Sequence, residues 1–241
     1  MSGHSKWAKL KHFKGALDAK KSAMFSKVSH MITIAAREGG GDPETNFKLR
    51  LAIEKAKQVN MPKENIERAI NRGSGKTGEA QIEEVIFEAF LPGGAALVIE
   101  SLTDNKNRTA ASLRRIFNKH GGSLVGQNAV LWMFERKGII RISDFKTKIL
   151  NPDDFQLKII DSGAQDIREE GGELAIYTNS EDLQKIKEII EKGGVSVDYA
   201  EVEWFPKNLV KISSEDQKKV EAIFVELDDD PDVSDYYSNI I

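Results

Sequence analysis

The hydrophobic pattern of the chain changes its period once, at a short glycine-rich segment, residues 73–80. Before this segment the apolar residues recur at intervals of three, four or seven, which is the period of one face of a helix. They are Leu17, Met24, Val28, Met31 and Ala35. After it, short β-rich runs alternate with helical stretches. We therefore expect a helical unit followed by α+β structure.

The first part of the chain predicts three helices. One spans residues 16–37 and ends before the breaker cluster at 39–43. A second covers residues 44–59, which are rich in good helix formers. The third starts at Pro62, whose missing N–H costs nothing at a first helical position, and ends at Gly73. Together they predict a small three-helix bundle.

The second part predicts strands and helices in alternation. Pro92, Gly93 and Gly94 separate two β-rich runs and indicate a hairpin. The expected strands are residues 85–90, 95–102, 129–134, 139–142, 174–178, 197–205 and 209–212, with a short C-terminal segment at 236–241. The expected helices are residues 108–119, 155–169, 181–192 and 214–227.

A weak internal repeat bears on the architecture. A helix, a Gly-Gly stop and a strand carrying tryptophan occur twice, at Gly121-Gly122 with Trp132 and at Gly193-Gly194 with Trp204. Both tryptophans are expected in the core. The repeat predicts two small α/β units, ferredoxin-like, each an antiparallel sheet with helices on one face.

The predicted fold class is therefore α+β and multidomain. Residues 1–76 form a basic helical domain with an N-terminal arm. Residues 131–206 form an inserted α/β domain, and the segment after Phe205, too short to fold alone, returns to complete the unit before it. That middle domain is discontinuous, residues 80–130 plus 207–241.

Charge is distributed unevenly along the chain. Residues 1–76 contain 16 Lys and Arg against 7 Asp and Glu, a net charge of +9, whereas the remainder contains 19 against 31, a net charge of −12. The overall net charge of −3 conceals this division. Such asymmetry indicates a polyanionic partner for the basic part.

The absence of certain residue patterns excludes several classes of protein. The sequence has no cysteine, which excludes disulfides, thiolate zinc sites and a cysteine nucleophile. No run approaches 18 apolar residues, and no secretory signal precedes the basic arm. We expect a cytoplasmic protein without a membrane partner.

The first 14 residues combine lysines with aromatic residues and do not separate into a polar and an apolar helical face. Lysines neutralise phosphates, and an aromatic ring can stack on a base. A solvated terminus is the alternative. The candidate nucleic-acid-binding residues here and in the first predicted helix are His4, Lys6, Trp7, Lys9, Lys11, Lys14, Lys20, Lys21 and Lys27.

A polar cluster at residues 104–109 lies between a predicted strand and a predicted helix. It can be a turn and cap, with Asn107 at the N-cap. It can equally present Lys106 and Arg108 to phosphate, so both are further candidate binding residues.

Catalytic and metal-binding patterns are weak. Residues 73–77 resemble only the end of a phosphate-binding loop, and the aspartates at 228–232 lack the glycine and closing Glu of a calcium loop. No HExxH, GxSxG or dinucleotide motif is present. We therefore expect no catalytic residue, no metal and no cofactor.

Several motifs together resemble the YebC family over essentially the full length. They are residues 2–7, 18–21, 25–27, 60–66, 104–109 and 119–122. The resemblance implies a helical N-terminal domain and two α/β domains, the last inserted into the middle one. It also implies a probable transcriptional regulator that binds DNA, or, as in the mitochondrial relative, a translational activator.

Two nucleic-acid functions remain open. One is a DNA-binding regulator of transcription, although no standard recognition helix is evident. The other is a ribosome-associated translational activator that uses the same lysines on ribosomal RNA. The sequence does not define the oligomeric state, although it slightly favours a monomer.

Overall fold

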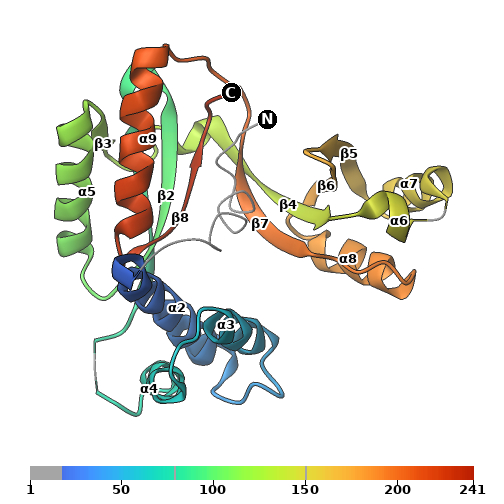
Figure 1. Ribbon diagram of the computed structural model, residues 1–241, viewed down its shortest axis with the longest axis horizontal. Helices are drawn as coiled ribbons and strands as arrows, with labels where there is room; N and C mark the ends of the chain where they lie inside the picture. Colours follow the sequence, from blue (N-terminus) through green and yellow to red (C-terminus); the bar gives the residue numbers. More distant parts are fainter. Residues whose placement is uncertain (1–17, 79, 150) are drawn as a thin grey trace.

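The computed structural model describes residues 18–78, 80–149 and 151–241 (Figure 1). Within them, helices come first and two four-stranded antiparallel sheets with their own helices follow. The structure confirms the α+β multidomain fold class, and the antiparallel sheets agree with the expected arrangement.

The helical unit consists of α2 (Asp18–Gly39), α3 (Phe47–Gln58) and α4 (Lys63–Gly73). Its core is made by apolar residues from all three helices, including Ile32, Leu49 and Ala69. Asn46 is the N-cap of α3: its side-chain oxygen accepts from Leu49 N, and its amide donates to the carbonyl of Ala35 in α2. This capping residue therefore also joins two helices.

The first sheet has the strand order β3-β1-β2-β8. Its strands are β1 (Glu83–Phe90), β2 (Ala96–Thr103), β3 (Ser123–Val125) and β8 (Val233–Ser238). The 3-10 turn η2 (Pro92–Gly94) joins β1 to β2, and Gly93 and Gly94 adopt positive φ there. The predicted hairpin is thus confirmed, because glycine permits this backbone without strain.

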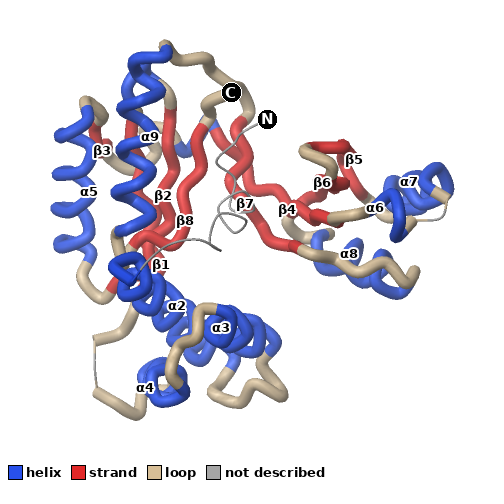
Figure 2. The backbone as a smooth tube through the Cα atoms, in the orientation of Figure 1, coloured by secondary structure: helices blue, strands red, loops and turns tan. Residues whose placement is uncertain are grey.

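Two helices cover one face of the first sheet, α5 (Lys106–His120) and α9 (Ser214–Asp229) (Figures 1 and 2). The core between them includes Leu97, Ile99, Phe117 and Ile223. The chain leaves this sheet after β3 and returns to it with α9 and β8. The residue boundaries of the three domains stay a prediction.

The second sheet has the order β5-β6-β4-β7. Its strands are β4 (Phe134–Ile142), β5 (Ala164–Glu170), β6 (Glu173–Asn179) and β7 (Tyr199–Pro206). The helices of this unit are α6 (Phe145–Lys148), α7 (Pro152–Asp161) and α8 (Leu183–Lys192). β4 and β7 pair along their whole length and link the two sheets (Figure 2).

Three predicted elements are wrong. The helix expected at 155–169 ends at Asp161, and the strand β5 follows Gly163, which has φ of 113°. Pairing with β6 overrides the helix propensity of that stretch. Residues 209–212 form only one isolated bridge, from Val210 to Ile240, and the strand expected at 129–134 begins only at Phe134.

Trp132 was expected in the core but is 64% exposed. It lies in the 3-10 turn η3 (Leu131–Met133), because the carboxylate of Glu88 accepts the N–H groups of Val130 and Leu131 and holds this segment as a turn. The indole Nε1 of Trp132 donates to the Ala129 carbonyl. Trp204 is partly buried and packs in a cluster between the two sheets, so its expected position agrees better.

Candidate nucleic-acid interface

The predicted basic residues fall into three groups in the structure. His4, Lys6, Trp7, Lys9, Lys11 and Lys14 lie outside the described residues. Lys20 and Lys21 belong to the first turn of α2. Lys27, Lys106 and Arg108 have described side chains, so their surroundings can be compared with the predicted role.

Lys27 connects the helical unit to the end of α9. Its Nζ donates to the carbonyl oxygens of Leu227, at 3.3 Å, and Asp228, at 2.7 Å. Burial lowers the pKa of this amine, and the aspartates around Asp228 oppose that shift. Its two acceptors are the kind of helix C-terminal carbonyls that cations stabilise. A phosphate contact by Lys27 stays a prediction, and it requires exchange of these partners.

Arg108 lies in a polar network at the start of α5. Its guanidinium contacts the carboxylates of Asp104 at 3.0 Å and Asp232 at 2.9 Å. The hydrogen bond to Asp232 raises the pKa of Arg108. Desolvation opposes ionisation of Asp104, but hydrogen bonds from Arg72 and Arg108 lower its pKa nonetheless. Arg108 therefore has protein partners, although its side chain is 54% exposed.

The N-cap of α5 is Asn105, not Asn107 as predicted. The Asn105 side chain accepts a hydrogen bond from Arg108 N, and the helix begins at Lys106. The predicted cap position is therefore shifted by two residues. Asn105 and Asn107 are the same residue type, so capping preference alone does not distinguish them. With Asn105 at the cap, Asn107 lies inside the helix and is exposed to solvent.

Lys106 is exposed at the same helix end. It lines a shallow hollow of about 420 Å³ on the open side of β1, together with Glu83, Glu84 and Glu88. The carboxylates next to it make this hollow unsuitable for a phosphate. Contact of Lys106 with nucleic acid stays a prediction.

Sequence reasoning missed the other cations of α5. Arg114, Arg115 and Lys119 are all exposed on this helix, and α5 contains no Asp or Glu. Winding residues 106–120 as a helix would have placed them on one face.

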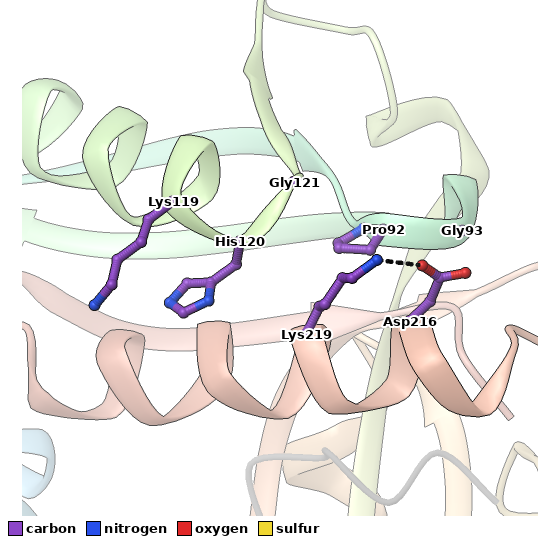
Figure 3. Close-up of a pocket in the computed structure, with 7 residues that line it drawn as sticks. All are labelled: Pro92, Gly93, Lys119, His120, Gly121, Asp216 and Lys219. Carbon is purple, nitrogen blue, oxygen red and sulfur yellow. Dashed lines mark ion pairs between the residues drawn. The ribbon is translucent and has the colours of Figure 1, made fainter.

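A pocket of about 390 Å³ lies at the other end of α5 (Figure 3). It is lined by Lys119, His120 and Gly121 at the end of α5, by Pro92 and Gly93 of the hairpin turn, and by Asp216 and Lys219 of α9. Lys219 and Asp216, three positions apart on the same side of α9, form an ion pair at 3.6 Å. Figure 3 marks this pair with a dashed line.

One carboxylate near this pocket is shared by two side chains at the end of α5. Glu226 contacts Lys119 Nζ at 2.7 Å and His120 Nε2 at 2.8 Å. Hydrogen bonds from Lys119 and His120 lower the pKa of Glu226 to about 2. Both lysines that line the pocket therefore have acidic partners, Glu226 for Lys119 and Asp216 for Lys219.

Two searches of the described residues bear on other functions. No group of three or more His, Cys, Asp or Glu within residues 18–78, 80–149 and 151–241 is arranged to hold a metal ion. In the same ranges, no helix has the length and hydropathy needed to cross a membrane.

Comparisons with known proteins cover the whole chain. Residues 5–76 match the model of the TACO1/YebC protein N-terminal domain, and residues 82–240 match that of the TACO1/YebC second and third domain. A probable transcriptional regulatory protein of Caldanaerobacter subterraneus is 48% identical over 240 residues, 100% of this chain and 98% of the relative. One of Thermotoga maritima is 50% identical over 99% of this chain and 93% of the relative.

A solved structure is similar as well. The crystal structure of a conserved hypothetical protein from Aquifex aeolicus superimposes with a TM-score of 0.80 at 41% sequence identity. The superposition covers 98% of this chain and 97% of that one. The arrangement of helices and sheets is therefore shared with a crystallographically determined protein.

Proposed function

Because the chain belongs to the TACO1/YebC family, whose curated relatives are named as regulatory proteins, we propose that it is a DNA-binding regulator of transcription that acts in the cytoplasm without catalysis. Its nucleic-acid contacts come from the basic helical domain and its N-terminal arm. The observation that carries this proposal is the division of charge, +9 in residues 1–76 against −12 in the rest.

The charge of residues 77–241, which we call the body, supports the assignment of binding to the N-terminal part. On the side of the second sheet opposite α7 and α8, the solvent-accessible acidic residues Glu135, Asp166, Glu170 and Glu201 outnumber the basic residues Lys137 and Arg168. Glu173, Glu203 and Arg141 on the same side are buried. A surface of this sign repels phosphate. The body therefore orients the nucleic acid toward the basic part.

The salt dependence of binding gives a quantitative expectation. If roughly six cations contact duplex phosphates, a plot of the logarithm of affinity against the logarithm of salt concentration has a slope of about −5. An affinity independent of salt concentration would exclude phosphate contacts as the basis of binding.

The first experiment separates a cell lysate on a sucrose gradient at two salt concentrations, with and without nuclease. A protein that stays near the top, or follows DNA, supports the proposal. Co-migration with ribosomes at low salt would instead favour the translational activator, with ribosomal RNA as the partner.

A charge variant tests the residues. Changing Lys6, Lys9, Lys11 and Lys14 to glutamine is expected to abolish binding to duplex DNA. The matched control changes four exposed lysines of the second unit, Lys146, Lys158, Lys185 and Lys192, to glutamine and removes the same charge. Equal loss of binding in both variants would contradict a specific role of the arm.

A further inference from the structure

The helix α5 has an unusual charge for a helix packed on a sheet of this protein. It contains five Lys or Arg and no acidic residue. α7 contains three acidic residues against one lysine, and α9 contains six against two lysines. α8 contains three lysines but also two glutamates, a net charge of +1 against +5 for α5. Packing on a sheet therefore does not require a basic helix here, and the charge of α5 needs another explanation.

The cations of α5 point to solvent from one face. Thr109, Leu113, Ile116 and Phe117 are buried against the first sheet. Steps of 100° per residue place the opposite face about half a turn away. This α5 face consists of Asn107, Arg108, Ala111, Arg114, Arg115, Asn118 and Lys119, all of them exposed. In Figure 1, α5 lies at the outer edge of the molecule, with α9 on one side only.

Nearby carboxylates neutralise the α5 face only in part. Arg108 pairs with Asp104 and Asp232. Glu226 is shared by Lys119, His120 and Arg115, the last at 3.8 Å. Arg114 has no ion-pair partner among the described side chains. Lys119 has a structural explanation, because a cation near the helix C-terminus interacts favourably with the helix dipole. Arg114 and Arg115 lie further inside the helix, so this explanation is weaker for them.

The α5 face lacks the means to stack on unpaired bases. Phe117 is the only aromatic residue of α5 besides His120, and it is fully buried. A rigid helix of 15 residues is about 22 Å long, which matches a regular row of phosphates better than a flexible single strand. Asparagine and arginine are also the side chains that commonly contact DNA phosphates and base edges.

We propose that the α5 face is a second DNA-binding surface, which contacts the phosphates of a duplex through Arg114 and Arg115 in addition to the contacts of the basic helical domain. This inference rests on the proposed function and names a separate part of the chain for it. It places one contact surface on the otherwise acidic body.

The test is a variant with Arg114→Gln and Arg115→Gln, which keeps good helix formers at exposed positions. Its affinity for a 20-base-pair duplex DNA in about 0.1 M salt is expected to fall by roughly tenfold, and its salt slope by about 2. The matched control, Lys158→Gln with Lys192→Gln, removes the same charge from exposed positions of α7 and α8 and is expected to change affinity less than about twofold.

The variant with Lys6, Lys9, Lys11 and Lys14 changed to glutamine, the arm variant, separates this inference from the proposed function. If that variant loses binding while the Arg114 and Arg115 variant keeps the affinity and salt slope of the unmodified protein, the α5 face is not a contact and the proposed function stands. If the unmodified protein binds no DNA, both proposals fail. An equal loss in the Lys158 and Lys192 control would show a general charge effect and overturn the inference.

Two further measurements keep the result interpretable. Circular dichroism checks that the double variant is folded; should it unfold, Arg114→Gln alone is expected to lower the salt slope by about 1. Duplex RNA and single-stranded DNA are measured in parallel. A loss confined to either of them would overturn the assignment to duplex DNA.

Discussion

The two sheets share one design and differ in what covers their second face. Each has four antiparallel strands and a pair of helices on one side, α5 and α9 for the first and α7 and α8 for the second. The other side of the first sheet carries Ala96, Val98 and Tyr237, which pack against Val130 and Phe134 from the chain entering the second sheet. Another part of the chain therefore supplies its cover.

The second sheet covers itself with its own long side chains. Ile139, Ala175 and Tyr177 form a small buried cluster on its open side. The Arg168 guanidinium lies 5.2 Å from the ring centre of Tyr177, and Lys137 Nζ lies 5.0 Å from that of Phe205. Aliphatic stems with charged ends thus substitute for a packing partner. The comparison teaches that similar sheets can bury the same kind of face by different means.

Glu88→Ala in the first sheet is expected to have the largest effect. Glu88 is buried, and its carboxylate accepts the N–H groups of Asn128, Val130 and Leu131 at 2.6–2.8 Å. Removal leaves these donors without an acceptor and should lower the free energy of unfolding by about 3–5 kcal/mol. Urea unfolding measures it. A cost below about 1 kcal/mol would mean that water replaces the carboxylate and that the covered face is more open than described.

Trp204→Phe is expected to have the next largest effect on stability, because Trp204 lies where the two sheets meet. The indole Nε1 donates to Glu100 at 3.0 Å, and the Arg136 guanidinium lies 4.8 Å from the ring centre. The variant should lose about 1–2 kcal/mol of stability in thermal or urea unfolding. Trp132→Phe is the control and should change stability by less than about 0.5 kcal/mol, since that ring is exposed. Equal effects would contradict the distinction between the two tryptophans.

The pH dependence of the stability of Glu226→Gln tests the ion pairs between α5 and α9, the two helices that cover the first sheet. The pKa of Glu226 lies near about 2, below its ordinary value of 4.5, so its ion pairs stabilise the folded state above pH 4.5 and are lost as pH falls through about 2. The variant should be less stable than the unmodified protein at pH 7, by under about 1 kcal/mol because the pairs are near the surface.

That difference should disappear as pH approaches 2. Glu181→Gln, an exposed change in the second unit, serves as the control and should show no such trend. A Glu226→Gln difference that persists at pH 2 would show that the effect does not come from the charge of Glu226.

Arg168→Ala in the second sheet should have the smallest effect, about 0.5 kcal/mol. The guanidinium is exposed, pairs with Asp166 at 2.6 Å and covers the Tyr177 ring. A double-mutant cycle with Tyr177→Leu isolates the contact between the two side chains. A loss above about 2 kcal/mol in the free energy of unfolding would contradict this ranking. It would show that the charged side chains over the second sheet stabilise it as much as the packed segment stabilises the first.

Locally encoded elements of this fold were predictable from the sequence. The helices of the first unit, the hairpin at Gly93 and Gly94 and the helix stop at Gly121 depend on residues within a few positions. The strand β5 and the turn at Trp132 were missed because their conformation is set by partners far along the chain, β6 and Glu88 respectively.

The candidate site was predictable in composition but not in contacts. Lys27 and Arg108 carry the expected charge, yet their acceptors near Asp228 and Asp232 lie more than one hundred positions away, and no local pattern reveals them. Arg114 and Arg115 lie within a stretch whose helical period is visible in the sequence. Helical winding would have found them.

The return of β8 to the first sheet has a consequence for biosynthesis. Ser101 in β2 pairs with Val233 in β8, so the ribosome must make the entire second unit before this edge of β2 is covered. At translation rates of about 5–20 residues per second, that interval lasts roughly 7–26 s. During it, β2 presents an unpaired edge and a half-built core, a state in which nascent chains are vulnerable to aggregation. The second sheet, whose strands are consecutive in synthesis, can close first, so the order of completion is the reverse of the order in which the two units begin.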